Sequence, residues 1–149
     1  MPDAVNIVEV SPRDGLQNEA QFVATEDKLA LIERLIACGL RSIEATAFVS
    51  PKWVPQMATS TEVMARIARR AGKIYSALTP NMQGFEAALA ARADEVVIFG
   101  SASEAFSQKN INCSIAESIA RFEGVAKAAK EHGLRLRGIN NKAELAERV

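Results

Sequence analysis

The chain of 149 residues is long enough for one ordinary domain with its own core. Its 18 basic and 18 acidic residues cancel, which argues against a nucleic-acid partner because nucleic-acid-binding domains carry a basic excess. No stretch approaches the ~18 consecutive apolar residues of a membrane helix, and the N-terminus lacks a secretion signal. Cys38 and Cys113 have no metal-binding spacing and are expected to be reduced thiols. We therefore expect a cytoplasmic protein that binds neither membranes nor nucleic acids.

Apolar runs and amphipathic stretches alternate along the chain. In chain order they predict a strand at 5–10, a helix at 25–38, a strand at 40–46, a helix at 59–71, a strand at 73–78, a helix at 83–91, a strand at 95–99, a helix at 114–132, a strand at 134–137 and a last helix at 141–149. Thr25 is expected to cap the first helix and Gly39 to end it. The sequences at 59–62 and 114–117 have the spacing of capping boxes, so they mark where two further helices begin.

Strands that alternate with helices at this spacing predict parallel βα units in one α/β domain over residues 1–149. The segments that follow strands are mostly long and rich in polar residues, and they lie at 11–24, 47–58, 79–82 and 101–113. The segments that follow helices are mostly one or two residues long. Ligand sites of βα-barrels and open α/β sheets lie at the carboxyl ends of the strands. The chemistry is therefore expected on the strand-to-helix segments.

Arg13 and Asp14 stand side by side directly after the first predicted strand. An aspartate at a strand end is a hard oxygen ligand that suits Mg²⁺ or Mn²⁺. An adjacent arginine can bind a carboxylate or stabilise an oxygen on which negative charge develops. The alternative is a salt-bridged pair that only ties down the loop, with Gly15 forming the turn.

Glu44 lies inside a predicted strand, where it alternates with the apolar residues Ile43 and Ala45. In a barrel its side chain would point inward. A buried carboxylate is costly unless it is paired or bound to a metal. Arg13 or the shell of a metal ion are the expected partners, so this position favours a functional role.

Residues 48–57, FVSPKWVPQM, place two prolines, Lys52 and Trp53 in one loop. This composition indicates a rigid lid or a pocket wall. Packing of Trp53 on a neighbouring helix explains the same composition equally well. Lys52 could meet an anionic substrate, although most lysines in loops are solvated.

Four further polar residues are expected to have structural roles. Asn112 or Ser114 should cap the following helix rather than bind a ligand. His132 should interact with the C-terminal dipole of its helix, on the side away from the strand ends. Cys38, at the end of the first predicted helix, is expected to lie in the core.

Five sequence runs resemble hydroxymethylglutaryl-CoA lyase. They are SPRDGLQNE at 11–19, IEATAFVSPKWVPQM at 43–57, LTPNMQGFEAA at 78–88, FGSASEAFSQKNINCSIAES at 99–118 and RLRG at 135–138. The resemblance extends over about 5–138, and 139–149 diverge from the family. Related Claisen-type synthases of the same metal-dependent superfamily share mainly the Arg-Asp-Gly element.

The resemblance implies a TIM barrel that cleaves 3-hydroxy-3-methylglutaryl-CoA to acetyl-CoA and acetoacetate, in leucine and ketone-body metabolism. It implies an acyl-CoA substrate and a divalent cation, Mg²⁺ or Mn²⁺. By this resemblance, Asp14 would be a metal ligand and Arg13 a catalytic, substrate-binding residue that stabilises the enolate oxygen. Glu44 would support Arg13 and the metal shell, and Gln17 would be a polar neighbour of the substrate.

The chain departs from the family in two ways. Ala47 stands where the family usually has serine, and the later metal ligands and the catalytic-cysteine loop are missing. We therefore expect a truncated (β/α)₈ barrel of about four to five βα units that is inactive alone. We expect it to self-associate or to pair with a full-length lyase chain. The alternatives are another acyl-CoA lyase or Claisen-type synthase, or a non-catalytic half-barrel that acts by association.

Overall fold

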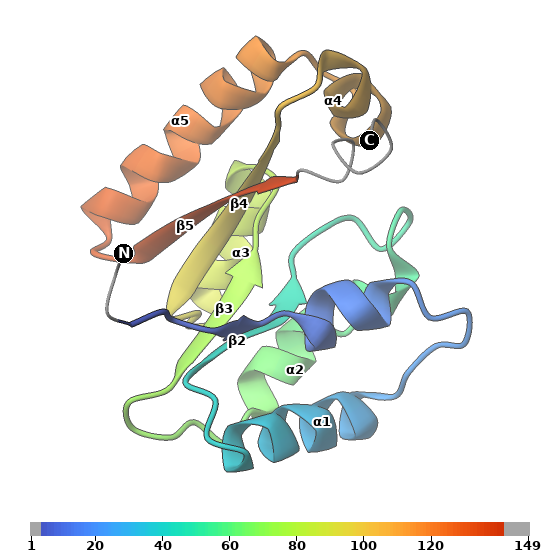
Figure 1. The fold of residues 1–149 in the computed structure, drawn as a ribbon, viewed down its shortest axis with the longest axis vertical. Coiled ribbons are helices and arrows are strands. Elements are labelled where there is room, and N and C mark those ends of the chain that lie inside the picture. The colour runs from blue at the N-terminus through green and yellow to red at the C-terminus, as the bar shows by residue number, and fades with distance from the viewer. Residues whose placement is uncertain (1–3, 142–149) are drawn as a thin grey trace.

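Five parallel strands form one sheet in the computed structural model, which describes residues 4–141 (Figure 1). The strands are β1 (Val8–Glu9), β2 (Ser42–Ala47), β3 (Ile74–Leu78), β4 (Glu95–Ser101) and β5 (Arg135–Asn141). The helices are α1 (Thr25–Ala37), α2 (Ser60–Arg66), α3 (Met82–Ala90), α4 (Glu104–Ile111) and α5 (Ile115–Glu131). A π-helical turn at Ser11–Gly15 and a 3₁₀ turn at Pro55–Met57 complete the regular structure.

The sheet keeps the order of the sequence, β1-β2-β3-β4-β5, and every neighbouring pair is parallel. Each strand pairs with the next one after an intervening helical segment, which is the repeating unit of a βα-barrel. Helices α1, α2, α3 and α5 lie around the outside of the curved sheet (Figure 1). The predicted α/β half-barrel is therefore confirmed. Of the predicted last helix, Asn141 belongs to β5 and the rest lies outside the described residues.

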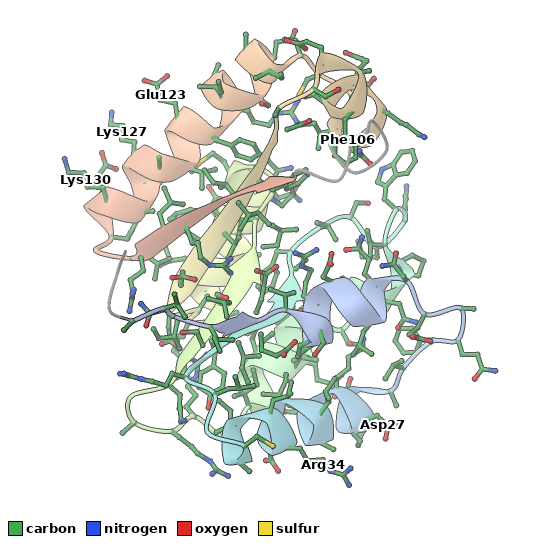
Figure 2. All side chains as sticks on the ribbon, in the orientation of Figure 1. Asp27, Arg34, Phe106, Glu123, Lys127 and Lys130 are labelled. Carbon is green, nitrogen blue, oxygen red and sulfur yellow. The ribbon has the colours of Figure 1, made fainter. Side chains whose placement is uncertain are left out.

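The main core fills the layer between the sheet and the helices. Apolar side chains such as Ile43 and Val96 of the strands meet Ile32, Phe85 and Val125 of the helices, and all five are almost fully buried. The opposite faces of the helices carry charge, as the side chains of Asp27 and Arg34 on α1 and Glu123, Lys127 and Lys130 on α5 show (Figure 2). This division is what an amphipathic helix on a sheet requires.

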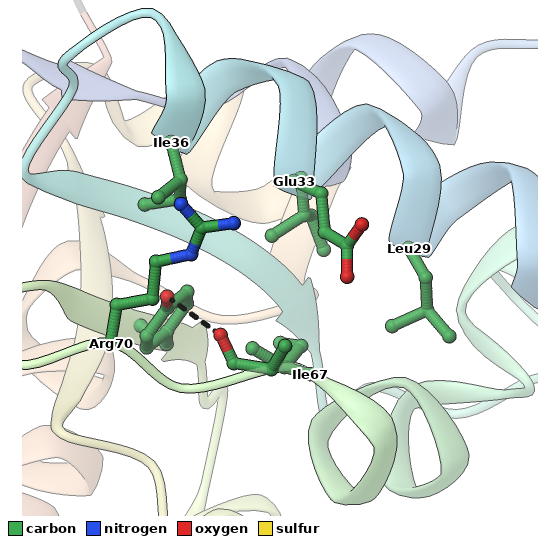
Figure 3. Close-up of a pocket in the computed structure, with 8 residues that line it drawn as sticks. Leu29, Glu33, Ile36, Ile67 and Arg70 are labelled. Atoms are coloured by element: carbon green, nitrogen blue, oxygen red, sulfur yellow. Dashed lines mark hydrogen bonds between the residues drawn. The ribbon is translucent and has the colours of Figure 1, made fainter.

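Helix α2 ends five residues earlier than the predicted helix at 59–71. The chain leaves the helical conformation at Ile67, whose ψ is 126°, and the side chain of Ile67 turns into the core beside Ile36 and Tyr75. The hydroxyl of Tyr75 donates to the carbonyl of Ala68 at 3.4 Å, which supports the extended segment (Figure 3). Tertiary packing thus overrides the local helical pattern. The expected capping box at 59–62 is wrong too, because the side chain of Thr59 makes no capping bond.

Two further expectations about the first helix are wrong. Ala24, not Thr25, precedes α1, and the hydroxyl of Thr25 donates to Glu62 of α2 at 3.2 Å. Cys38 is exposed rather than part of the core, because the helix end lies at the surface. Gly39 does follow the helix with a φ of +96°, a conformation that glycine adopts without strain.

Helix α4 occupies most of a segment predicted to be a loop. Ser103 caps it by accepting a bond from the amide of Phe106 at 3.3 Å, and Asn112 ends it in the left-handed conformation. The expected capping box at Ser114 is confirmed. Ser114 accepts from the amide of Glu117 at 3.1 Å, and the carboxylate of Glu117 accepts from the amide of Ser114 at 2.7 Å. His132 is the C-cap of α5, as expected.

Candidate functional site

The turn after β1 fixes Arg13 and Asp14 at the carboxyl end of the sheet. Glu9 accepts a bond from the amide of Ser11 at 2.8 Å, and the carbonyl of Val10 accepts from the amide of Asp14 at 2.7 Å. Amides in the first turn of a helix have no acceptor within the helix, so Pro12, which has no amide hydrogen, suits this position. π-Helical turns are rare and often occur at functional sites.

Arg13 and Glu44 form a buried ion pair between this turn and β2. Nε of Arg13 donates to Oε1 of Glu44 at 2.5 Å, and the side chains are 9% and 0% exposed. Nη1 of Arg13 donates to Oδ1 of Asp14 at 2.7 Å. The expected partnership of Arg13 and Glu44 is therefore present, and Nη2 of Arg13 has no acceptor within residues 4–141. A guanidinium held in this way presents a charged donor in a fixed direction.

Arg137 of β5 joins the same network, although it is not among the predicted site residues. Its Nη2 donates to Oε2 of Glu44 at 2.6 Å, and its Nε donates to Oε1 of Glu95 at 2.9 Å. The alternation Arg135-Leu136-Arg137 is a signal that could have identified it, because it puts two arginines on the face that meets buried carboxylates. Burial lowers the pKa of Arg137, but hydrogen bonds to Glu95 and Glu44 outweigh this effect and raise the pKa above its ordinary value.

Among the described residues at this place, Asp14 is the exposed carboxylate that could reach a divalent cation. The side chain of Asp14 is 57% exposed, and one of its oxygens already accepts from Arg13. Within residues 4–141, no group of three or more His, Cys, Asp or Glu side chains lies close enough to hold a metal ion. A Mg²⁺ site needs several oxygen ligands in near-octahedral geometry. The residues described do not make such a site by themselves.

Gln17 is partly buried just after the π-helical turn, and its side chain makes no hydrogen bond to another residue of the described chain. Ala47 is fully buried at the end of β2. The hydroxyl of Ser60 donates to the carbonyl of Ala47 at 2.7 Å and lies 2.6 Å from the hydroxyl of Thr46. The hydroxyl of Ser60 on α2 therefore lies beside the end of β2, where Ala47 itself has no hydroxyl.

The loop at 48–57 is tied to the loop that follows the π-helical turn. The side-chain amide of Gln56 donates to the carbonyls of Glu19 and Gln21 and accepts from the amide of Val23 at 3.0 Å. Trp53 is 86% exposed, so the alternative that it packs on a neighbouring helix does not hold. The lid or pocket wall stays a prediction.

Two hollows of the surface have linings that do not include Arg13. A small one lies between α1 and the segment after α2, lined by Leu29, Ile36 and Ile67 (Figure 3). A larger apolar groove of about 510 Å³ lies between α5 and the carboxyl-terminal halves of β4 and β5. None of the helices formed by residues 4–141 is long and apolar enough to cross a membrane.

Known proteins resemble the chain over most of its length. A 3-hydroxy-3-isohexenylglutaryl-CoA/hydroxy-methylglutaryl-CoA lyase from Pseudomonas aeruginosa is 56% identical over 93% of the chain and 46% of its own length. A 3-hydroxy-3-methylglutaryl-CoA lyase from Danio rerio, named as cytoplasmic, is 59% identical over 93% of the chain and 41% of its own length. A mitochondrial hydroxymethylglutaryl-CoA lyase from Homo sapiens is 57% identical over 93% and 42%. The chain thus spans less than half the length of these relatives.

Solved structures share the fold. An HMG-CoA lyase from A. baumannii, in complex with coenzyme A and 3-methylmalate, superposes with a TM-score of 0.87 at 36% identity, over 93% of the chain and 45% of that structure. A family model described as HMGL-like matches residues 4–148. With the parallel half-barrel and the paired Arg13 and Glu44 at its strand ends, this match shows that the chain belongs to the HMGL-like family.

Proposed function

We propose that this chain supplies the enolate-stabilising part of a hydroxymethylglutaryl-CoA lyase active site. The observation that supports it best is the buried pair of Arg13 and Glu44 at the carboxyl ends of β1 and β2. The relatives named above, which are lyases for hydroxymethylglutaryl-CoA, support the same reaction.

The proposed reaction is the cleavage of 3-hydroxy-3-methylglutaryl-CoA to acetoacetate and acetyl-CoA. The 3-hydroxyl loses its proton, the bond between C2 and C3 breaks, and its electron pair moves onto the thioester as an enolate. Protonation of C2 then gives acetyl-CoA. Negative charge develops on the enolate oxygen in this step. A positively charged, pre-oriented donor such as the guanidinium of Arg13 would stabilise it.

Arg13 fits this role because Glu44 fixes its Nε, while its Nη2 has no acceptor within the described chain. Glu44 would keep the guanidinium charged and oriented. Gln17, in the same segment, would offer its amide to the substrate. Asp14 as a ligand of Mg²⁺ or Mn²⁺ remains a prediction, because a full metal site needs ligands that residues 4–141 do not supply. For the same reason we expect the 149-residue chain to be inactive alone.

Two other functions remain alternatives. The first alternative is a different acyl-CoA lyase. The relative from Pseudomonas aeruginosa supports it, because its name includes 3-hydroxy-3-isohexenylglutaryl-CoA beside hydroxymethylglutaryl-CoA. Cleavage or binding of longer 3-branched glutaryl-CoA esters in preference to hydroxymethylglutaryl-CoA would favour it. A half-barrel that acts only by association would bind neither. We also propose a cytoplasmic location; the relative from Danio rerio is named as cytoplasmic and the one from Homo sapiens as mitochondrial.

Calorimetric titration of the purified chain tests the proposal. We expect hydroxymethylglutaryl-CoA to bind more tightly than coenzyme A alone, and we expect Arg13→Gln to remove this difference. Arg41→Gln is the matched control, because Arg41 is exposed and makes no ion pair among the described residues. Equal affinities for the two ligands in the unsubstituted chain would contradict the proposal. Acetoacetate formed with Mg²⁺ or Mn²⁺ present would instead refute the expected inactivity.

A further inference from the structure

We propose that Arg137, held by Glu95, is a positioning residue that orients Arg13 through Glu44. The purpose of this arrangement rests on the proposed function, because Arg13 is the residue that would meet the substrate. The geometry itself rests on three hydrogen bonds that connect β5, β4, β2 and the turn after β1.

Glu44 has one arginine on each carboxylate oxygen. Oε1 accepts from Arg13 at 2.5 Å and Oε2 accepts from Arg137 at 2.6 Å, and the side chain of Glu44 is fully buried. A carboxylate bonded at both oxygens cannot rotate without breaking a charge-assisted bond. Glu44 therefore links two guanidinium groups, and neither of its oxygens is left without a donor to act as a general base.

The register of the sheet leaves room for the contact between Arg137 and Glu44. Glu44 pairs with Ser76, and Ser76 pairs with Glu95, so the three residues lie in one row across β2, β3 and β4. Ser76 is buried and small, and its hydroxyl donates to the carbonyl of Ile43 at 3.3 Å. Glu44 and Glu95 lie at the two ends of this row with the small Ser76 between them, and Arg137 donates to both carboxylates.

Glu95 fixes Arg137 in turn. Nε of Arg137 donates to Glu95 at 2.9 Å, and the two side chains are 22% and 10% exposed. Loss of Arg137 would remove the donor from Oε2 of Glu44 and from Oε1 of Glu95 in a place largely closed to water, where an unpaired charge is costly. Glu44 would then be free to turn away from Arg13.

The Nε–H signal of Arg13 in a ¹⁵N NMR spectrum measures the order of this guanidinium directly. In the unsubstituted chain we expect a resolved signal that exchanges slowly with water, because the donor is buried and bonded to a carboxylate. Arg137→Lys keeps the positive charge but cannot bridge Glu44 and Glu95 with a planar group. We expect it to speed the exchange of the Arg13 signal by about tenfold or more, the scale of one lost hydrogen bond.

Arg135→Lys is the matched control. Arg135 lies two residues away on the same strand, is 65% exposed and comes no closer to Glu95 than 4.0 Å. It should leave the Arg13 signal unchanged. Glu95→Gln removes only the charge that holds Arg137, so it should speed the exchange of the Arg13 Nε–H less than Arg137→Lys does. It replaces Arg137→Lys in the test if that variant does not fold. Unchanged Arg13 exchange in the folded substituted chains would overturn the inference.

Ligand titration of the same variants separates this inference from the proposed function. If the unsubstituted chain binds hydroxymethylglutaryl-CoA, Arg137→Lys should weaken binding by about tenfold and Arg135→Lys should not. If the unsubstituted chain does not bind it, the proposed function fails. The positioning of Arg13 is judged in that case by the exchange of its Nε–H alone.

Discussion

Lys28 is a charged residue almost completely buried beneath the loop at 48–57. Its ammonium group donates to the carbonyl of Gln56 and to the hydroxyl of Thr59 at 3.1 Å, and it lies 4.8 Å from the centre of the Phe22 ring. No carboxylate forms an ion pair with it within the described part of the chain. Burial therefore lowers the pKa of Lys28 below its ordinary value of 10.5.

This lowered pKa predicts a pH dependence of stability. Between the pKa of Lys28 in the folded chain and 10.5, the unfolded chain binds more protons at this residue, so the free energy of unfolding should rise with pH. Below the folded pKa both states are charged and the full cost of burying the ammonium remains. Urea denaturation at pH values from 7 to about 10.5 measures this rise.

Lys28→Met should flatten the pH dependence, whereas Lys127→Met should retain it because Lys127 is exposed on α5 (Figure 2). Equal slopes in both variants would mean that other groups cause the rise.

Two glycines in helices should respond to alanine in opposite directions. At Gly84, a Cβ atom would lie 2.7 Å from the carbonyl oxygen of Phe48 and 3.0 Å from Cδ of Pro80, so Gly84→Ala should destabilise the fold by about 1–3 kcal/mol. At Gly124 the nearest atoms are those of Met82 at 3.8 Å. Gly124→Ala should stabilise the fold by about 0.5–1 kcal/mol. Thermal unfolding measures both effects. A higher melting temperature for Gly84→Ala than for Gly124→Ala would contradict the prediction.

The pairing of Arg13 with Glu44 could be predicted, because strand alternation points Glu44 inward and a buried carboxylate needs a partner. The alternation at 135–137 indicates which face of the strand Arg137 occupies, but its contact with Glu44 could not be deduced in the same way. β3 and β4 lie between the strands that carry Glu44 and Arg137, and the strand register that brings the two side chains together is not visible in the local sequence pattern.

At the scale of elements, all five strands and most of the helices follow from hydrophobic periodicity and capping signals. Helix α4 does not, because its sequence has no apolar stripe. It is held instead by Ser103 at its start and by a bond of 2.8 Å from the buried hydroxyl of Ser107 to the carbonyl of Cys113. Such side-chain contacts specify a helix only after the neighbouring segment is in place.

The capping box of α5 permits a direct test. Ser114→Ala should lower the free energy of unfolding by about 1 kcal/mol, because the amide of Glu117 loses its acceptor. Ser114→Gly should cost only a few tenths of a kcal/mol, because glycine is itself favourable at an N-cap. Chemical denaturation of both variants checks this, and equal losses would show that the serine hydroxyl contributes through something other than capping.

At the scale of the whole molecule, the sheet described by residues 4–141 has two open edges. β5 pairs with β4 alone within this range, and its seven residues form the longer edge. Leu136 is partly exposed on it, and the apolar groove beside α5 lies next to it. A long edge strand with apolar neighbours is a template for pairing with another chain.

We therefore predict that the chain self-associates through the β5 edge. Light scattering after size exclusion should show a mass that increases with protein concentration, and Leu136→Lys should shift the chain toward the monomer because a lysine on an edge strand opposes pairing. Trp53→Lys is the comparison, since Trp53, in the loop at 48–57, is the most exposed large apolar side chain among the described residues. Dissociation by Trp53→Lys and not by Leu136→Lys would place the contact elsewhere.

The order of the strands also bears on how the protein is made. Because each strand pairs with its predecessor in the sequence, every βα unit can dock on an edge that already exists when it emerges from the ribosome. The bond between Glu44 and Arg137 breaks this rule, since 93 residues separate its partners. At translation rates of 5–20 residues per second, roughly 5–20 s pass between the synthesis of Glu44 and that of Arg137, and during this time Oε2 of Glu44 lacks its donor. During that interval Arg13 is the only one of the two arginine partners of Glu44 that has been synthesised, and the proposed positioning of its guanidinium can begin only when β5 emerges.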